Sequence, residues 1–198
     1  MAVDLERRRF GGVDRTWSVR EFNLFLTTCM ADGHEDFAAI ACLTWYAGLR
    51  IHECFRIDTA IAEQSLRENA STIKGKGGKV RMVPINENIC IELKKMLAVT
   101  ERGHKLFVAD DELTHTAIGR LQQYIYKVRP QIQDEGSTRP MTHHGLRHSL
   151  AARTYQELID SGISPLNASL CVSQPLGHER PDVTWGYLAS VKDGADGK

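Results

Sequence analysis

The side chains best suited to chemistry include two pairs near the C-terminal end of the chain. In THHGLRHSLAARTY, His144 and Arg147 are three residues apart, a spacing that places them on one helix face or in its first turn. No acidic residue lies in 137–155, so these cations have no local partner, and clustered cations at a helix start favour an anion site. In LGHERPDVTWGYL, His178 precedes Tyr187 by nine residues. Either residue taken alone is more often structural than catalytic.

Two further features lie in the first half of the chain. Arg50, within AGLRIHE, follows an expected helix break, although it can also form an ordinary ion pair with Glu53 three residues later. The segment STIKGKGGKVRMVPI, residues 71–85, contains no acidic residue. It does contain four cations, Lys74, Lys76, Lys79 and Arg81. Lysines on strand edges often prevent aggregation, but lysines at a glycine-rich turn can also contact phosphates of DNA.

Together these side chains suit the cleavage of a phosphodiester without a metal ion. The guanidinium groups of Arg50 and Arg147 can bind the non-bridging oxygens, and Lys76 can protonate the leaving oxygen. A tyrosine hydroxyl such as that of Tyr187 can attack phosphorus when a base or nearby cations assist it, because its pKa is about 10. The set is completed by two histidines, His144 and His178.

A metal site is the alternative interpretation of one motif. His144 and His148 have the i,i+4 spacing of two zinc ligands, but Gly145 stands where a zinc protease has glutamate. Arg147 between them would repel a divalent cation. The five cysteines are widely spread and form no C-x-x-C pair. We therefore expect no metal and no other cofactor.

Composition sets the broad class of the protein. The 198 residues fit one large domain, and 42% hydrophobic with 25% charged residues exclude disordered and fibrous classes. Lys plus Arg equals Asp plus Glu, at 25 each, so any anion site must be local. The N-terminus has no apolar signal segment, and the apolar run 37–49 is too short to span a bilayer. These features predict a cytoplasmic protein without membrane contact.

The elements expected to position these side chains are mostly helical. Ser18 and Glu21 form a capping box, and 36–47 is apolar nearly all round, as in a central helix. Further helices are expected over 50–57, from Asn86, over 118–128 with Pro130 as its end, from Thr142 to about 160, from Pro165, and from Arg180. Residues 71–85 predict two antiparallel strands, and no βαβ alternation occurs. The fold class is thus mainly α (α+β), with one small hairpin.

In this order the motifs resemble those of the tyrosine recombinases, the phage integrase family. AGLRIHE is similar to the box of the first arginine, GKGGKVRMVPI to the hairpin with the catalytic lysine, and HGLRH to the H-x-x-R box. LGHERPDVTWGY resembles the last histidine followed nine residues later by the nucleophilic tyrosine. The resemblance covers about 18–190. These matched positions in family order are far more specific than any one motif.

The resemblance implies a mechanism and a partner. Tyr187 attacks a phosphate of double-stranded DNA to give a 3′-phosphotyrosyl link, and Arg50 and Arg147 hold the pentavalent phosphate. Lys76 protonates the leaving 5′-oxygen, although Lys74 and Lys79 flank it. His144 serves in general acid/base catalysis. His178 hydrogen-bonds the phosphate. The reaction, which needs neither ATP nor a metal, supports site-specific recombination or integration of a mobile element.

The same resemblance sets expectations for domain organisation and assembly. Residues 1–17 are expected to be a flexible lead-in, 18–190 the catalytic domain and 191–198 a disordered tail. The family usually adds an N-terminal core-binding domain, so the chain resembles a catalytic domain alone, monomeric when free and tetrameric on DNA. Lys74, Lys79 and Arg81 are expected to bind DNA, and without DNA the Tyr187 segment is expected to swing away from the arginines.

Two other functions remain open from the sequence. A type IB topoisomerase uses the same chemistry without a specific DNA site. An accessory domain of the same fold would bind DNA and perform no chemistry unless a core-binding domain is supplied.

Overall fold

The structure is a computed structural model, and it describes residues 13–74, 80–177, 186–188 and 191. Its described helices are α1 (Val19–Ala31), α2 (Glu35–Ala47), α3 (Ile51–Cys54), α4 (Thr59–Glu68), α5 (Glu87–Val99), α6 (Thr114–Ile132), α7 (His143–Asp160) and α8 (Pro165–Leu176). The described strands are β1 (Ala70–Lys74) and β2 (Val80–Pro84), which pair antiparallel. The predicted class, mainly helical with one small antiparallel hairpin, is confirmed.

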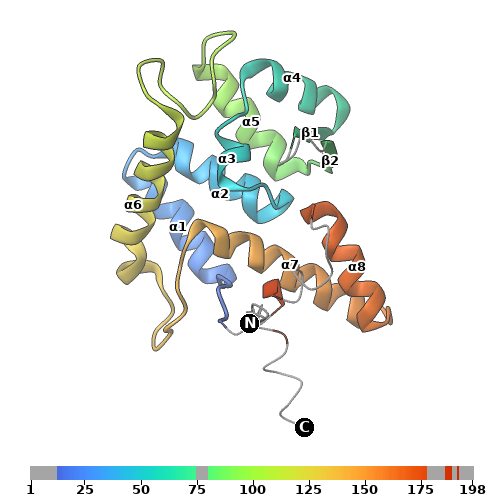
Figure 1. The fold of residues 1–198 in the computed structure, drawn as a ribbon. Coiled ribbons are helices and arrows are strands. Elements are labelled where there is room, and N and C mark those ends of the chain that lie inside the picture. The colour runs from blue at the N-terminus through green and yellow to red at the C-terminus, as the bar shows by residue number, and fades with distance from the viewer. Residues whose placement is uncertain (1–12, 75–79, 178–185, 189–190, 192–198) are drawn as a thin grey trace, which may run out of the picture.

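Helix α2 is the centre of the fold. It lies between an upper group formed by α4, α5 and the hairpin and a lower group formed by α7 and α8 (Figure 1). Its residues are buried on every side, from Phe37 through Trp45 to Ala47, because the sequence is apolar nearly all round. Gly48 ends the helix with φ of 64°, a left-handed conformation that favours glycine. The chain therefore turns sharply just before Arg50.

The hairpin directs alternate side chains inward. Ser71, Ile73 and Val83 are buried, whereas Met82 and Val80 on the other face are exposed. In the register of the two strands, Ile73 lies opposite Arg81, which places the Arg81 side chain on the inner face. The residues that join the strands, 75–79, lie outside the described residues.

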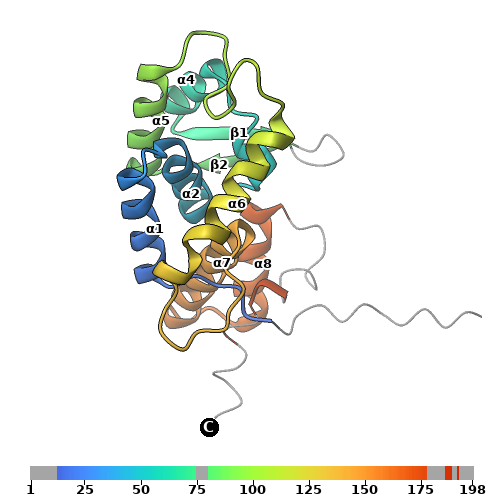
Figure 2. The ribbon, with the colours of Figure 1, turned by 90° about the vertical axis from the view of Figure 1, so that its left-hand side faces the viewer.

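Two apolar clusters form the interior. The larger one joins α1, α2, α5 and α6, with Phe25, Ile40 and Leu121 fully buried. A smaller cluster lies between α7 and α8, and it also includes Tyr187 and Leu188. Figure 2 shows α7 and α8 side by side in the lower part of the molecule. The segment that carries Tyr187 is thus anchored on the α7–α8 pair.

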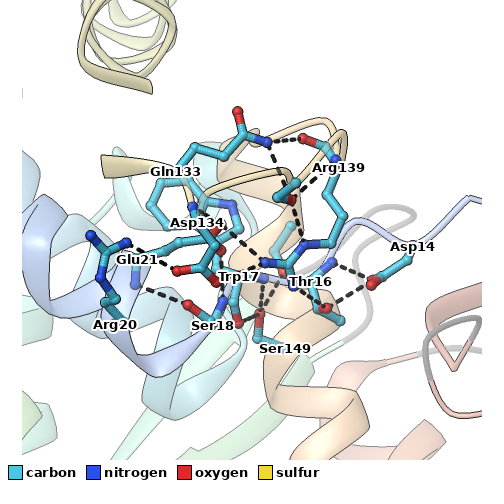
Figure 3. Close-up of polar contacts among 12 residues, drawn as sticks. Asp14, Thr16, Trp17, Ser18, Arg20, Glu21, Gln133, Asp134, Arg139 and Ser149 are labelled. Atoms are coloured by element: carbon cyan, nitrogen blue, oxygen red, sulfur yellow. Dashed lines mark hydrogen bonds and ion pairs between the residues drawn. The ribbon is translucent and has the colours of Figure 1, made fainter. Parts of the chain in front are cut away.

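The segment that leads into α1 is packed onto α7 (Figure 3). Trp17 is buried, its backbone N–H donates to the Ser149 hydroxyl at 2.7 Å, and that hydroxyl donates to the Trp17 carbonyl at 3.1 Å. The capping box of Ser18 and Glu21 is confirmed. Trp17, which the sequence placed in the N-terminal lead-in, is therefore packed onto the domain; residues 1–12, 189–190 and 192–198 lie outside the described residues.

The fully buried carboxylate of Glu21 connects the start of α1 with the loop before α7 (Figure 3). It accepts hydrogen bonds from the backbone N–H groups of Ser18 and Asp134 and from Arg139, at 2.7, 3.0 and 3.0 Å. A buried charge needs such partners to offset its lost hydration. The Glu21 carboxylate thus holds the loop before α7 against the start of α1.

Two elements differ from the sequence-based expectation. Helix α4 was not predicted, although Asp58 accepts from the Ile61 N–H as an ordinary N-cap. Pro130 does not end its helix, because α6 continues to Ile132. Proline removes one backbone hydrogen bond, here to the carbonyl of Tyr126, and the Tyr126 side of the helix faces solvent. The loss occurs in the last turn, where it disturbs the helix least.

Candidate active site

The start of α7 carries His144 and Arg147. The predicted cap Thr142 accepts a hydrogen bond from the Gly145 N–H, and the Thr142 carbonyl accepts from the Trp17 indole at 3.0 Å. A Cβ atom on Gly145 would lie 2.2 Å from the Arg15 carbonyl oxygen and 2.8 Å from the Trp17 indole nitrogen. Only glycine fits there, so residues 15–17 pack directly against the H-x-x-R turn.

Arg147 is completely buried, and its guanidinium group is oriented by the main chain. It donates hydrogen bonds to the carbonyl oxygens of Gly48 and Leu176. Burial lowers its pKa to about 10, whereas Tyr187 acts in the opposite direction through its charge and a hydrogen bond. The group therefore remains protonated at neutral pH and provides a fixed positive charge inside the protein.

Arg50 lies beside Arg147, brought there by the turn at Gly48. Its Nη1 atom donates to Glu53 at 3.0 Å, and its Nη2 atom lies 3.4 Å from the carbonyl oxygens of both Leu176 and Gly177. The Leu176 carbonyl thus accepts from both arginines. Arg50 keeps 28% of its side chain exposed, so it can meet an anion from solvent.

Tyr187 lies against the H-x-x-R helix and is only 9% exposed. Its ring stacks on His148 with centroids 4.1 Å apart, meets the His144 ring edge-on at 5.2 Å, and lies 5.7 Å from the Arg147 Cζ atom. The expectation that the free protein holds this tyrosine away from the arginines differs from this geometry. The α7–α8 cluster supplies the reason, because it buries Tyr187 together with Leu188.

The two adjacent histidines of THHGLRH occupy different environments. His143 is buried, and its Nε2 atom forms a 2.9 Å hydrogen bond with the Thr44 hydroxyl. Burial lowers its pKa to about 3. His144 is on the exposed side, and burial together with the charges of Arg147, Arg15 and Arg50 lowers its pKa to about 4. His144 is therefore neutral at pH 7 and able to accept a proton.

Glu53 is the site residue whose importance the sequence did not indicate. Its side chain is 1% exposed, accepts from the Arg50 N–H at 2.8 Å, and pairs with the Nη1 and Nη2 atoms of Arg81 at 2.8 and 2.7 Å. Burial raises its pKa, but the hydrogen bonds from Arg81 and from the Arg50 backbone outweigh that effect and hold the pKa at about 2. The i,i+3 spacing predicted only the Arg50 pair, whereas Arg81 comes from the distant hairpin.

The cationic hairpin is described only in part. Lys74 is exposed at the end of β1, whereas Arg81 is 14% exposed and points inward to Glu53. A Cβ atom on Gly177 would lie 3.3 Å from Arg81, so the inner face of the hairpin meets the end of α8. Lys76, Lys79 and His178, which the sequence assigned to catalysis or DNA binding, lie outside the described residues.

A cavity of about 370 Å³ opens beside the two arginines. One wall is formed by Arg50, His144 and Arg147, and the other by α6, including Tyr126 and Arg129. None of the described residues that line it is acidic. Its electrostatic character is thus positive even though the whole chain has no net charge.

Two kinds of feature are absent from the part of the chain that the structure describes. No group of three or more His, Cys, Asp or Glu side chains in that part of the chain could hold a metal ion. Among its helices, none combines the length and the apolar character needed to cross a membrane.

The fold and the arginine–histidine–tyrosine site can be compared with known proteins. A profile of the Phage integrase family matches residues 19–193. The chain therefore belongs to the phage integrase family. No curated protein matches its sequence.

Solved structures with the same fold are distant in sequence. The XerA recombinase is 20% identical, with a TM-score of 0.64 over 93% of this chain and 65% of that one. The Tn1549 transposon integrase with transposon right end DNA is 14% identical, with a TM-score of 0.65 over 97% and 68%. A lambda integrase dimer bound to a COC′ core site is 15% identical, with a TM-score of 0.65 over 92% and 50%. The chain thus spans between half and about two thirds of these proteins.

Proposed function

We propose that the protein cleaves and rejoins strands of double-stranded DNA through a covalent 3′-phosphotyrosyl intermediate on Tyr187, as a site-specific recombinase or integrase. The observation that carries the proposal is the position of the Tyr187 ring, against both His144 and Arg147 although it comes from a separate segment of the chain. Membership of the phage integrase family supports it independently.

In the proposed cleavage step, the Tyr187 hydroxyl oxygen attacks phosphorus and the bond to the 5′-oxygen breaks. The phenolic proton passes to a neutral base, and His144 is the proposed acceptor because it is neutral at pH 7 and its ring lies 5.2 Å from the Tyr187 ring. The leaving 5′-oxygen takes a proton from Lys76. Rejoining is the reverse, with a 5′-hydroxyl attacking the phosphotyrosine, so the bond energy is kept and ATP is not required.

The arginines carry the electrostatic part of the proposed mechanism. The Leu176 carbonyl orients the guanidinium groups of both Arg50 and Arg147. Fixed donors aimed at the developing charge need no reorganisation during the reaction, which is usually the largest contribution to catalysis. Two permanent cations also supply what a metal ion provides in other phosphoryl-transfer enzymes, so we propose that the reaction is metal-independent. His178 is proposed as a further phosphate contact.

Assembly follows from the same proposal. We propose that the protein is a monomer when free and associates to a tetramer on DNA, in the cytoplasm, with Lys74 and Lys79 contacting the backbone. The lambda integrase structure contains a dimer on DNA, which supports association on the substrate.

The decisive experiment traps the covalent intermediate. The protein is incubated with a pool of nicked duplexes randomised around the nick, in which the cleaved end diffuses away, and protein–DNA adducts are separated on denaturing gels and sequenced. We expect adducts with the parent protein and none with Tyr187→Phe, which keeps the ring packing but lacks the nucleophilic oxygen. Equal trapping by the two proteins would refute the assignment of Tyr187.

The same preparation separates the alternatives. Relaxation of supercoiled plasmid without sequence preference in the adducts would indicate a type IB topoisomerase. DNA binding without any adduct would indicate an accessory domain of the same fold. Loss of cleavage on adding a chelator would contradict the metal-independent mechanism.

A further inference from the structure

We propose that the cavity between α6 and the start of α7 binds the nucleotide next to the cleaved phosphate, with its base against the ring of Tyr126. The inference rests on the proposed function, because it takes the phosphate to lie at Arg50 and Arg147. It adds a binding site for one nucleotide and names the residues that would sense its base.

The cavity is continuous with the proposed phosphate site. Arg50, His144 and Arg147 line one side of it, so an anion held by the two arginines would lie at its wall. Adjacent phosphates of a DNA strand are only a few ångströms apart, and the nucleotide between them cannot leave the neighbourhood of the bound phosphate. The opposite wall of the cavity, on α6, is a surface that such a nucleotide can meet.

The α6 wall presents an aromatic ring flanked by polar groups. Gln122, Tyr126 and Arg129 follow at i, i+4 and i+7, so they share one face of the helix. Tyr126 is 70% exposed, and the Arg129 Cζ atom lies 4.9 Å from its ring centroid. Exposed aromatic rings paired with arginine are the surfaces on which proteins stack nucleobases.

Tyr124, two residues earlier, shows the contrast within the same helix. It is 6% exposed, packs on Phe25 and Phe37, and donates its hydroxyl to Asp32 at 3.0 Å. The core therefore accounts for Tyr124, whereas it does not account for Tyr126. A ring left in solvent at the mouth of a cationic cavity fits a ligand surface better than a packing role.

The interior of the cavity suits a base and the charge suits its phosphate. Three almost fully buried apolar residues, Leu49, Ile125 and Met141, form part of its lining. The volume of about 370 Å³ lies in the usual range for ligand sites of about 300–1,000 Å³. Arg50, Arg129 and Arg147 face it, and none of the described lining residues would repel an anion. Charge and shape thus favour a nucleotide over a neutral metabolite or a peptide.

The test is a coupling between Tyr126 and a single base. Starting from one DNA sequence trapped by the parent protein, the bases on either side of the cleaved phosphate are replaced one at a time by abasic sites. For one position we expect the parent to lose adduct formation about tenfold, in line with stacking on an aromatic ring. Tyr126→Ala should lose about tenfold on intact DNA and nothing further at that abasic position, while Tyr126→Phe should behave like the parent.

The matched control is Tyr124→Phe, which changes the same residue type on the same helix away from the cavity and should retain the parent's response to every abasic site. Independent losses from Tyr126→Ala and from each abasic site would overturn the inference. If the parent forms no adduct, the same coupling is measured as binding affinity in Tyr187→Phe with fluorescent oligonucleotides. Coupling in binding would then retain the nucleotide site while the proposed strand transfer fails, and its absence there would overturn the site as well.

Discussion

The start of α7 and the Arg50–Glu53–Arg81 cluster each position one part of the site, and different interactions stabilise them. The α7 start is fixed by neutral hydrogen bonds: Trp17 with Ser149, and Thr44 with His143. The second cluster is fixed by charge, with one buried carboxylate between two guanidinium groups. Each part carries one of the two arginines that would bind the phosphate.

The two arginines are therefore held in position in different ways. Arg147 is held in a rigid frame because it is completely buried and two backbone carbonyls accept its hydrogen bonds. Arg50 depends on a carboxylate that it shares with Arg81 from the hairpin. A movement of the hairpin therefore reaches Arg50 directly through Glu53, whereas it reaches Arg147 indirectly, through the approach of Arg81 to Gly177 beside the Leu176 carbonyl.

The largest effect is expected from Glu53→Gln. The amide cannot satisfy two guanidinium groups, and breaking a buried ion pair costs about 3–5 kcal/mol of unfolding free energy. Denaturant unfolding should show a loss near the lower figure, because Arg50 is 28% exposed. Glu92→Gln, which removes the surface pair with Lys95, is the control and should cost less than about 1 kcal/mol. Similar losses for both variants would contradict a charge-based cluster.

The next effect separates the two parts by pH. His143 has a folded-state pKa of about 3, below its unfolded value of about 6.5, so the unfolded state binds the proton first. Stability is complete above pH 6.5 and falls as the pH is lowered, by about 2 kcal/mol at pH 5. Glu53 loses its contribution only from about pH 4.5 down to about 2.

Unfolding measured between pH 7 and 5 therefore tests the histidines with lowered pKa, without the contribution of Glu53. His143→Gln keeps a polar group near Thr44 but does not titrate, so it should remove the His143 part of the slope and leave the part that belongs to His144 and His52. An unchanged slope in that variant would assign the pH dependence to other groups.

The smallest effect is expected from Ser149→Ala. It removes the acceptor for the buried Trp17 N–H, and we expect a loss of about 1 kcal/mol, at the low end of the range for a buried donor left without a partner. Adduct formation should fall further than stability alone explains, because Ser149 is two residues after Arg147 and fixes the same turn. Thr28→Ala, which removes a hydroxyl bonded within α1, provides the control. A loss of stability with full adduct formation would restrict Ser149 to a structural role.

Local sequence signals predicted much of the fold. The capping residues Ser18, Asn86, Thr142 and Ser164 mark real helix starts, because a cap depends on neighbours within three residues. The apolar run of α2 indicated the central helix for the same reason. Pro130 misled the prediction, since the cost of a proline depends on how many turns follow it.

The sequence predicted residues that form the site, but it did not predict the contacts that hold them in place. Motif spacing brought out Arg50, His144, Arg147 and Tyr187, four residues that the structure brings together. The pairing of Glu53 with Arg81 is a contact between a helix and a hairpin, and the role of Trp17 depends on a segment folding back onto α7. Such contacts depend on tertiary packing, which the local patterns of a single sequence do not reveal.

Because the backbone carbonyls of Gly48 and Leu176 orient Arg147, the backbone conformation at these positions decides which substitutions the site tolerates. Every residue type has a carbonyl, so substitutions of the Leu176 side chain leave the acceptor in place. The constraint falls instead on the left-handed turns at Gly48 and Gly177, with φ of 64° and 62°. A Cβ atom at Gly48 would also lie 2.9 Å from Leu150. The orientation of Arg147 thus depends on the backbone conformation of two glycines and not on any polar side chain at those positions.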